Sequence, residues 1–355
     1  MRQFVMWLLV HLVGVCAGQQ LLLPRDLATD IALHEAVEAL DGKADVDVDV
    51  DAILSTCGNR THFTMTLRGS KGAGMDINQD RAFIYFMENG GMLQVVLDGH
   101  GGLGHNVSQF GVDEIPGRLE KLLTQTQNVT LVEEALIQVA HDVDDAMPED
   151  IGARGGATLT MVLLLENRLY FANAGDSQSF LAHGSSVVYA TRLDKPDEPS
   201  EKARVLEMGG RVSEASAYDD ARVYYTHSNG HQYGLAMSRS IGDHGATGVI
   251  PTPVVYSLDM EELKNGKECE AEVLDDGSVV EDCLDAKWFV VSASDGVLDY
   301  QELGKIAGVY NTVLFSGDRH PIAFTRQFLY ETAKLWQRDT GGTYRDDMVF
   351  AVSVV

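Results

Sequence analysis

The sequence predicts an α+β fold made of antiparallel sheets and helices. Apolar runs typical of strands occur in pairs joined by short turns, and runs with helical spacing are grouped between those pairs. A parallel βαβ fold would alternate strand and helix one by one, so this grouping favours antiparallel sheets. The clearest strand candidates are 63–67, 82–87, 93–97, 158–165, 169–174 and 179–182.

Three segments have the apolar spacing of helices. In 131–147, Val132, Leu136, Val139 and Val143 recur every three or four residues and therefore share one side. The other two candidates are 118–126 and 321–336. We find no internal repeat and no second domain boundary inside 56–355, so a single domain is expected there.

The first residues have the order of a secretory signal peptide. Met1-Arg2 precedes the apolar run from Phe4 to Cys16, and small residues follow at Ala17-Gly18. The run is too short to span a bilayer comfortably. We therefore expect a signal peptide over 1–18 and a secreted or lumenal mature chain, with a buried N-terminal helix or a membrane anchor as the alternatives.

Residues 19–55 differ in composition from the remainder of the chain. A stretch with helical spacing runs into the alternating Asp45-Val46-Asp47-Val48-Asp49-Val50-Asp51. That alternation suits a strand, but repeated acidic residues favour a solvated linker. We expect an acidic N-terminal segment or linker over 19–55, and then the folded domain over 56–355.

The net charge limits the partners of the chain. A formal charge of -26 argues against a nucleic acid or an anionic membrane, because both require a basic face. It permits divalent cations and basic protein substrates. After removal of the signal peptide we therefore expect no membrane partner and no nucleic-acid partner.

Two further features suit a secretory protein. Cys269 and Cys283 flank a segment with an Asp-Gly turn at its middle, so antiparallel pairing would bring them opposite each other for a disulfide. The alternative is a surface insertion with two unpaired thiols. Triplets that accept N-linked sugars begin at Asn59, Asn106 and Asn128.

Three separate apolar runs border on an aspartate at a turn. Asp98 and Asp295 follow such runs, and Asp346 precedes one. Strand ends on a rigid scaffold can hold side chains still and bring them to one point. Carboxylates held together repel one another, and a hard cation such as Mg²⁺ or Mn²⁺ removes that conflict by taking oxygen ligands. The pattern predicts a metal site.

A longer series of motifs in chain order closely resembles the protein phosphatase 2C family, the metal-dependent serine/threonine phosphatases. The resemblance covers about residues 61–355, and the whole ordered series carries it rather than any one motif. The motifs are Asn78-Gln79-Asp80, Val96 to Gly102, Gly156-Ala157-Thr158, Ala172 to Ser177, Asp194-Lys195-Pro196, Gly209 to Val212, Leu235 to Asp243, Ser292 to Asp299 and Arg345-Asp346-Asp347.

The resemblance implies two packed antiparallel β-sheets flanked by α-helices, and hydrolysis of phosphoserine and phosphothreonine in phosphoproteins. It implies two Mg²⁺ or Mn²⁺ ions per active site, with a third weaker ion, and a monomeric enzyme. The implied metal residues are Asp98 as the bridge, Gly99 through its carbonyl, Asp295 and Asp346 as further ligands, Asp80 holding water at the metal, and Asp176 and Asp299 at the third ion.

The resemblance also assigns residues beside the metals. His100 matches the histidine proposed as general acid for the leaving alkoxide, a task that suits an imidazole with a near-neutral pKa. Gln79 stands where many relatives have glutamate; it can still orient water but contributes no charge. The family's phosphate-binding arginine is replaced by Gly74-Met75-Asp76, so Lys71, or alternatively Arg68, is the candidate for that role.

Other positions depart from the family pattern. Asp347 replaces the usual asparagine, which leaves the choice of ligand between Asp346 and Asp347 open, and Gln178 replaces a common arginine. The chain is longer than the compact family form at 218–231 and 261–283, which are either substrate-selecting loops or surface decoration. The competing functions are a non-catalytic binding protein with the same fold and a phosphohydrolase of small molecules in the secretory route.

Overall fold

The structure of the protein is a computed structural model. It describes residues 50–57, 60–71, 77–123, 128–216, 220–226, 230–265, 270–273, 279–282, 287–316 and 320–355. The expected signal peptide, most of the expected linker, Asn59, Gly74-Met75-Asp76, and Cys269 and Cys283 lie outside these residues. Among the helices of these ranges, none is both long and apolar enough to cross a bilayer.

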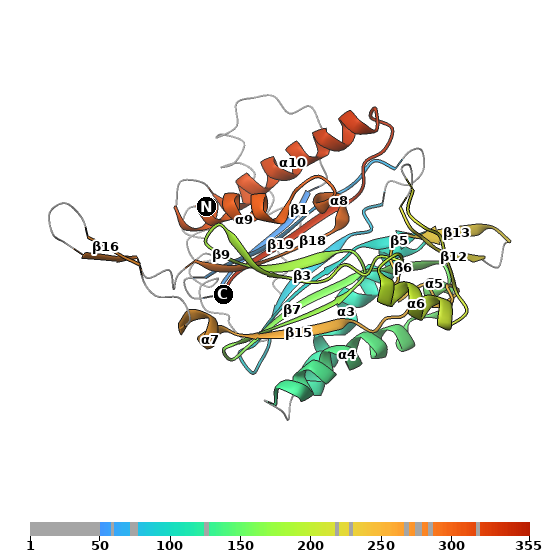
Figure 1. Ribbon diagram of the computed structural model, residues 1–355, viewed down its shortest axis with the longest axis horizontal. Helices are drawn as coiled ribbons and strands as arrows, with labels where there is room; N and C mark the ends of the chain where they lie inside the picture. Colours follow the sequence, from blue (N-terminus) through green and yellow to red (C-terminus); the bar gives the residue numbers. More distant parts are fainter. Residues whose placement is uncertain are drawn as a thin grey trace, which may run out of the picture.

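Two antiparallel sheets pack face to face in the middle of the fold (Figure 1). In spatial order, the six-stranded sheet contains β1 (Val50–Cys57), β2 (Arg60–Leu67), β19 (Met348–Val354), β18 (Trp288–Ala293), β9 (Gln178–His183) and β10 (Ser186–Ala190). The five-stranded sheet contains β15 (Val254–Asp259), β8 (Arg168–Ala174), β7 (Leu159–Leu165), β4 (Met92–Leu97) and β3 (Arg81–Phe86).

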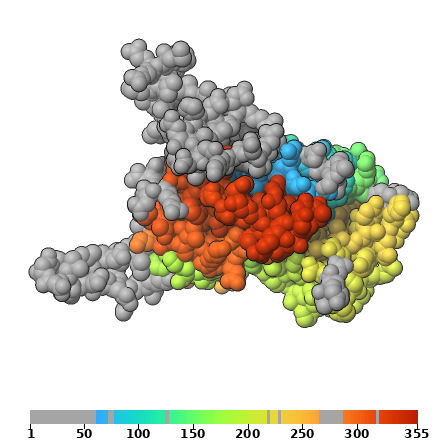
Figure 2. Space-filling view, turned by 90° about the horizontal axis from the view of Figure 1, so that it is seen from above, coloured from blue at the N-terminus to red at the C-terminus, as the bar shows by residue number. Residues whose placement is uncertain are grey.

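Helices cover the outer face of each sheet. α3 (Gly104–Leu123) and α4 (Val129–Ala146) share an apolar core with the five-stranded sheet, and α9 (Leu303–Phe315) and α10 (Pro321–Asp339) share another with the six-stranded sheet. Figure 2 shows α10 as the outer surface on its side of the molecule. The order helix, sheet, sheet, helix confirms the predicted α+β sandwich.

A buried polar network joins the two sheets. The Gln94 side chain donates to Ser292 Oγ at 2.8 Å and accepts from Ser353 Oγ at 2.7 Å. Ser179 Oγ lies 2.6 Å from Ser292 Oγ and 2.7 Å from Thr160 Oγ1. All five side chains are fully buried. A sliding movement of one sheet over the other would leave these groups without partners, so the network fixes the relative position of the sheets.

The structure corrects two boundaries. α3 begins at Gly104 rather than at Arg118, because the polar and glycine-rich stretch after residue 103 still places Val107 and Ile115 toward the core. Residues 50–55 belong to β1, which pairs with β2 along its whole length, so the expected linker is wrong over these residues. Of the alternating Asp-Val stretch, Val50 and Asp51 lie in this strand.

Smaller elements surround one end of the sandwich. β5 (Gly99–Gly101), β6 (Gly155–Ala157) and β14 (Ile241–Gly242) form one three-stranded sheet, near α5 (Glu149–Gly152). The insertion at 218–231 contributes to a second, formed by β11 (Arg211–Val212), β12 (Val223–Thr226) and β13 (Gln232–Leu235). α8 (Asp295–Leu298) follows β18 directly.

The second insertion follows α7 (Met260–Asn265). β16 (Glu270–Val273) pairs with β17 (Val279–Asp282) in antiparallel register, which confirms the predicted hairpin. In Figure 1 it projects from the end of the body opposite to β12 and β13. The pair farthest from the turn, at the open end of the hairpin, is Glu270 with Asp282. These residues are next to Cys269 and Cys283 in the sequence, and the disulfide between the two cysteines stays a prediction.

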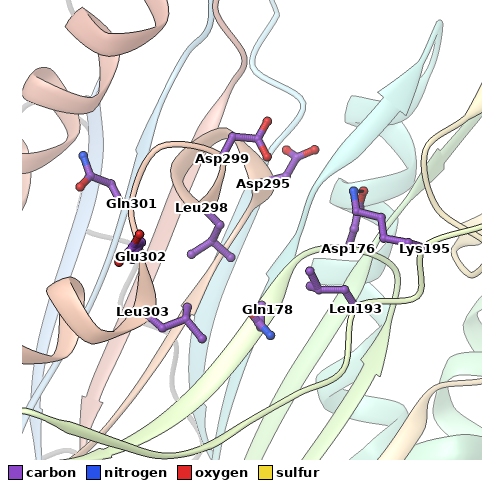
Figure 3. A pocket seen from close by; sticks show the side chains of 10 residues that line it. All are labelled: Asp176, Gln178, Leu193, Lys195, Asp295, Leu298, Asp299, Gln301, Glu302 and Leu303. Atoms are coloured by element: carbon purple, nitrogen blue, oxygen red, sulfur yellow. Dashed lines mark hydrogen bonds and ion pairs between the residues drawn. The ribbon is translucent and has the colours of Figure 1, made fainter. Parts of the chain in front are cut away.

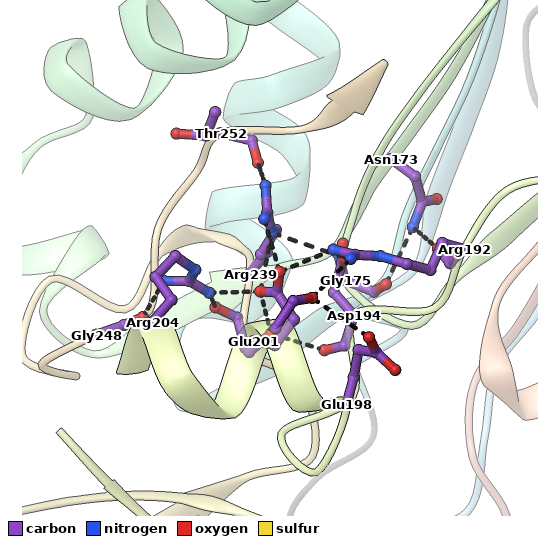
Figure 4. Close-up of polar contacts among 12 residues, drawn as sticks. Asn173, Gly175, Arg192, Asp194, Glu198, Glu201, Arg204, Arg239, Gly248 and Thr252 are labelled. Carbon is purple, nitrogen blue, oxygen red and sulfur yellow. Dashed lines mark hydrogen bonds and ion pairs between the residues drawn. The ribbon is translucent and has the colours of Figure 1, made fainter. Parts of the chain in front are cut away.

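A buried glutamate anchors α6 (Pro199–Glu207) to neighbouring segments of the same chain (Figure 4). Glu201 is 1% exposed and pairs with Arg192 at 2.8 Å, Arg204 at 2.5 Å and Arg239 at 2.6 Å. Burial alone would raise the pKa of Glu201, but hydrogen bonds from Arg239, Arg204 and Ser238 outweigh it and hold the pKa well below its usual range. Glu201 therefore stays ionised and ties three segments together.

We predict that Glu201→Gln lowers the free energy of unfolding by about 3 kcal/mol at pH 7, because the buried arginines lose their charged partner. Since the folded-state pKa is depressed, this contribution is complete above the unfolded pKa and is lost as pH falls toward the folded one. Urea unfolding at pH 7 and pH 4 measures both effects. Glu198→Gln is the matched control, because Glu198 begins the same helix and its side chain makes no capping hydrogen bond. Equal stability of the two variants at pH 7 would contradict the prediction.

Candidate metal centre

Acidic side chains from both sheets meet at one end of the sandwich. Asp98 follows β4, Asp295 follows Ser294 at the end of β18, and Asp346 lies just before β19. β18 and β19 are antiparallel neighbours, so the end of one lies beside the start of the other. Burial and the charges of Asp80, Asp295 and Asp346 raise the pKa of Asp98, whose side chain also shares a hydrogen bond with Asp295. The structure thus brings together the three predicted strand-end aspartates.

Asp80 is the most deeply buried member of this acidic cluster. It is 0% exposed, and its Oδ2 accepts a hydrogen bond from Ser294 Oγ at 2.8 Å. Burial and the charge of Asp347 raise the pKa of Asp80 well above its usual range. Within the described residues, Oδ1 of Asp80, of Asp176 and of Asp295 is buried without a hydrogen-bond partner. Buried carboxylate oxygens without partners are costly, and a cation would satisfy them.

The donor set suits a hard divalent cation, although the side chains are not yet grouped around one point. No group of three or more His, Cys, Asp or Glu side chains in the described ranges has a geometry that could already hold a metal ion. Lys71 Nζ lies 2.6 Å from Asp346 Oδ1 and 3.1 Å from Asp347 Oδ2, and so supplies positive charge at the cluster. Carboxylate oxygens are the ligands that Mg²⁺ and Mn²⁺ prefer, so these residues fit the predicted ions.

The two adjacent aspartates have different surroundings. Asp347 is 2% exposed, and its carboxylate accepts from the backbone N–H of Gly69 at 2.6 Å and of Gln79 at 3.1 Å. Asp346 contacts Lys71 and Tyr344 and acts electrostatically on Asp98. Of the pair, Asp346 therefore acts on Asp98, while Asp347 acts on Asp80 and accepts hydrogen bonds from the backbone of Gly69 and Gln79.

The residues next to Asp98 and Asp80 hold the turn in a tight arrangement. A Cβ at Gly99 would come within 2.6 Å of the carbonyl oxygens of Gln79 and Gly104, so only glycine fits there. The Gln79 amide donates to the carbonyl of Gly101 at 2.9 Å. Gln79 therefore fixes the loop that carries His100. This contact is separate from its expected role in orienting water at the metal.

His100 is paired with Asp243, a contact that sequence reasoning missed. His100 Nε2 lies 2.6 Å from Asp243 Oδ2, which also accepts from Ser240 Oγ at 2.6 Å. Burial would lower the pKa of His100, but Asp243 outweighs it and raises the pKa. Gly156 makes room for the pair, since a Cβ there would lie 2.5 Å from His100 Nε2. Asp243 belongs to the motif from Leu235 to Asp243, but nothing in that motif indicates that Asp243 contacts His100.

Asp176 and Asp299 lie at the edge of the acidic cluster. Asp176 Oδ2 is 2.7 Å from Lys195 Nζ, so a cation already neutralises part of its charge. Burial raises the pKa of Asp299 to about 6, with Lys195 opposing the shift and Asp176 adding to it. Asp220, from the 218–231 insertion, also acts on Asp299. The electrostatic effect of Asp220 places it on the same side of the molecule as Asp299, whereas the β16–β17 hairpin projects from the other end.

Comparison with known proteins identifies the family. Residues 88–270 match the family model of protein phosphatase 2C. The chain belongs to the protein phosphatase 2C family. Among curated relatives, a probable protein phosphatase 1N of Mus musculus is 29% identical over 62% of this chain and 48% of its own length. A probable protein phosphatase 2C 64 of Oryza sativa is 30% identical over 68% of this chain and 54% of its own length.

This phosphatase 2C family member spans about half the length of those relatives. Solved structures show the same fold at low identity. A serine-threonine phosphatase 2C from Toxoplasma gondii superposes with a TM-score of 0.59 at 16% identity, covering 85% of this chain and 98% of that one. A sex-determining protein of C. elegans gives 0.59 at 18% identity, covering 92% and 70%.

We predict that Mn²⁺ binding tightens between pH 6 and pH 8 and releases protons. Burial and neighbouring charges raise the pKa of Asp295 to about 7, so a proton occupies its carboxylate at pH 6, and they also raise the pKa of Asp98 above its usual range. A cation must displace bound protons, and each displaced proton strengthens the pH dependence by up to about tenfold per pH unit. Calorimetry in two buffers of different ionisation enthalpy measures affinity and proton release together. Affinity that stays constant from pH 6 to pH 8 would contradict the assignment.

Proposed function

We propose that this protein is a Mg²⁺- or Mn²⁺-dependent phosphatase that hydrolyses phosphoserine and phosphothreonine in phosphoproteins. The observation that carries the proposal is the acidic cluster of Asp80, Asp98, Asp295 and Asp346 with the His100–Asp243 pair beside it, on the fold of this family. The residues that would hold the two ions are Asp98, Asp295, Asp346 and, through its carbonyl, Gly99.

The two ions, when bound, supply an acidified water and neutralise the charge at phosphorus. The residues of the chain then do the rest. Asp80 is held by Ser294 and stays fixed within the core, where it can orient water. Asp176 and Asp299 would hold a third, weaker ion, in competition with Lys195. Lys71, whose Nζ contacts Asp346, is our candidate for binding the phosphate.

His100 has the arrangement of a general acid. Its Nε2 is committed to Asp243, while Nδ1 has no hydrogen-bond partner within the described residues. Asp243 favours the protonated ring, so Nδ1–H is available to protonate the departing serine or threonine alkoxide. That alkoxide is a poor leaving group, so protonation lowers the barrier.

We also propose that the protein works as a monomer in the secretory pathway. The support for the compartment is the order of basic, apolar and small residues over Met1 to Gly18. Two other functions remain as outcomes of the assays: a non-catalytic binding protein, which would bind Mn²⁺ without turnover, and a phosphohydrolase that prefers nucleotides or sugar phosphates to phosphopeptides.

We predict that Asp98→Ala lowers the rate of Mn²⁺-dependent phosphopeptide hydrolysis by about 10³-fold or more, while leaving the fold intact. The side chain lies in the acidic cluster, and its removal relieves repulsion in the metal-free protein. Turnover with a Mn²⁺ titration and an EDTA arm, together with circular dichroism, measures both. Unchanged turnover in the purified variant would overturn the proposed site.

We predict that Asp243→Asn slows hydrolysis of a phosphoserine peptide by about 10²-fold and that of p-nitrophenyl phosphate by much less. The variant lowers the pKa of His100, and only the alkoxide leaving group needs its proton. Comparing kcat for the two substrates separates this role from a structural one. An equal loss on both substrates would show that Asp243 does not act through the proton of His100.

A further inference from the structure

A pocket opens beside the acidic cluster, between two walls from different parts of the chain (Figure 3). One wall is the segment from α8 to the start of α9, with Leu298 and Leu303. The other contains Gln178 at the start of β9 and Leu193. Asp295 lines the pocket as well, so the pocket is continuous with the metal centre.

The wall of the pocket combines apolar and polar surface, and its charges are mostly acidic. Leu193, Leu298 and Leu303 supply hydrocarbon surface, and Asp299 and Glu302 supply carboxylates. Lys195, the cation in the lining, is paired with Asp176 at 2.7 Å. The other oxygen of Asp176, which is 2% exposed, has no partner within the described residues. A ligand with an apolar stem and a cationic head would match the leucines and the carboxylates of the lining.

Two details make the pocket more acidic at its outer end. Gln178 is neutral at a position where the resemblance to the family gives an arginine, so no cation from β9 opposes a basic ligand. Glu302 precedes α9, but its side chain makes no capping hydrogen bond to that helix. Its carboxylate is exposed and lies outside the acidic cluster, so no proposed metal ion would neutralise it.

We propose that this pocket binds a lysine or arginine side chain of the phosphoprotein substrate, from a residue near the phosphorylated serine or threonine. The methylenes pack against Leu298 and Leu303, and the cation meets Glu302, the carboxylate of the lining that no proposed metal ion uses. This rests on the proposed phosphatase function and adds a sequence preference to it. The formal charge of -26 favours the approach of such basic segments.

The test uses fluorescent peptides with a phosphonate in place of the phosphoserine phosphate, so binding is measured without turnover. A single arginine replaces alanine at each position from about four residues before to four after the phosphonate, and anisotropy gives Kd on the full chain with Mn²⁺. We expect arginine to lower Kd about tenfold at one position or two adjacent ones. Lysine at that position should behave similarly.

Variants locate the effect. Glu302→Lys should abolish the preference for arginine over alanine, and Leu303→Ala should reduce it, while both variants keep the circular dichroism spectrum of the unmodified protein. Glu134→Lys is the matched control, because Glu134 is exposed on α4, the layer over the other sheet, and makes the same change of charge. It should leave the preference intact.

The outcomes separate the two proposals. No hydrolysis of p-nitrophenyl phosphate would contradict the phosphatase function, and the binding preference would still be measurable. Equal Kd for arginine and alanine peptides at every position would overturn the pocket assignment, as would a preference for acidic residues. A preference that survives Glu302→Lys would also overturn it, because the basic side chain would then bind elsewhere.

Discussion

Repulsion between buried carboxylates is the constraint around which this end of the molecule is arranged. Asp80, Asp98, Asp295 and Asp346 approach one another from both sheets, and burial strengthens their mutual effect. A protein tolerates such an arrangement only when protons or cations compensate it. Lys71 supplies part of that compensation, and a pair of divalent ions would supply the rest. The cost to stability explains why the surrounding scaffold is so strongly fixed.

That scaffold consists of buried polar contacts that continue from the sheets into the site. The Gln94 network fixes the sheets relative to each other, and at the end of β4 the backbone of Asp98 exchanges hydrogen bonds with Thr158. Thr158 Oγ1 in turn lies 2.7 Å from Ser177, next to Asp176. The backbone at Asp98 and next to Asp176 is therefore held by buried contacts with little freedom to relax.

The sequence allowed the strand-end aspartates to be predicted, because a strand that ends in a carboxylate is a local pattern. Roles that depend on contacts between distant parts of the chain could not be predicted from the sequence. Asp243 is 143 positions from His100, and no spacing rule joins them. Likewise α3 was placed too late because His105, Asn106, Gly111 and Pro116 conceal its helical period, which packing against the sheet restores.

Two positions that the sequence analysis singled out, Lys71 and Asp347, are in direct contact in the structure. Asp347 adds a negative charge where relatives have asparagine, and Lys71 lies 3.1 Å from it, at the same carboxylate that Gly69 and Gln79 bind. With a neutral residue at 347, Lys71 would keep its ion pair with Asp346 and lose the one with Asp347. The charges of Asp347 and Lys71 thus balance each other, and Asp347 holds Lys71 beside the cluster.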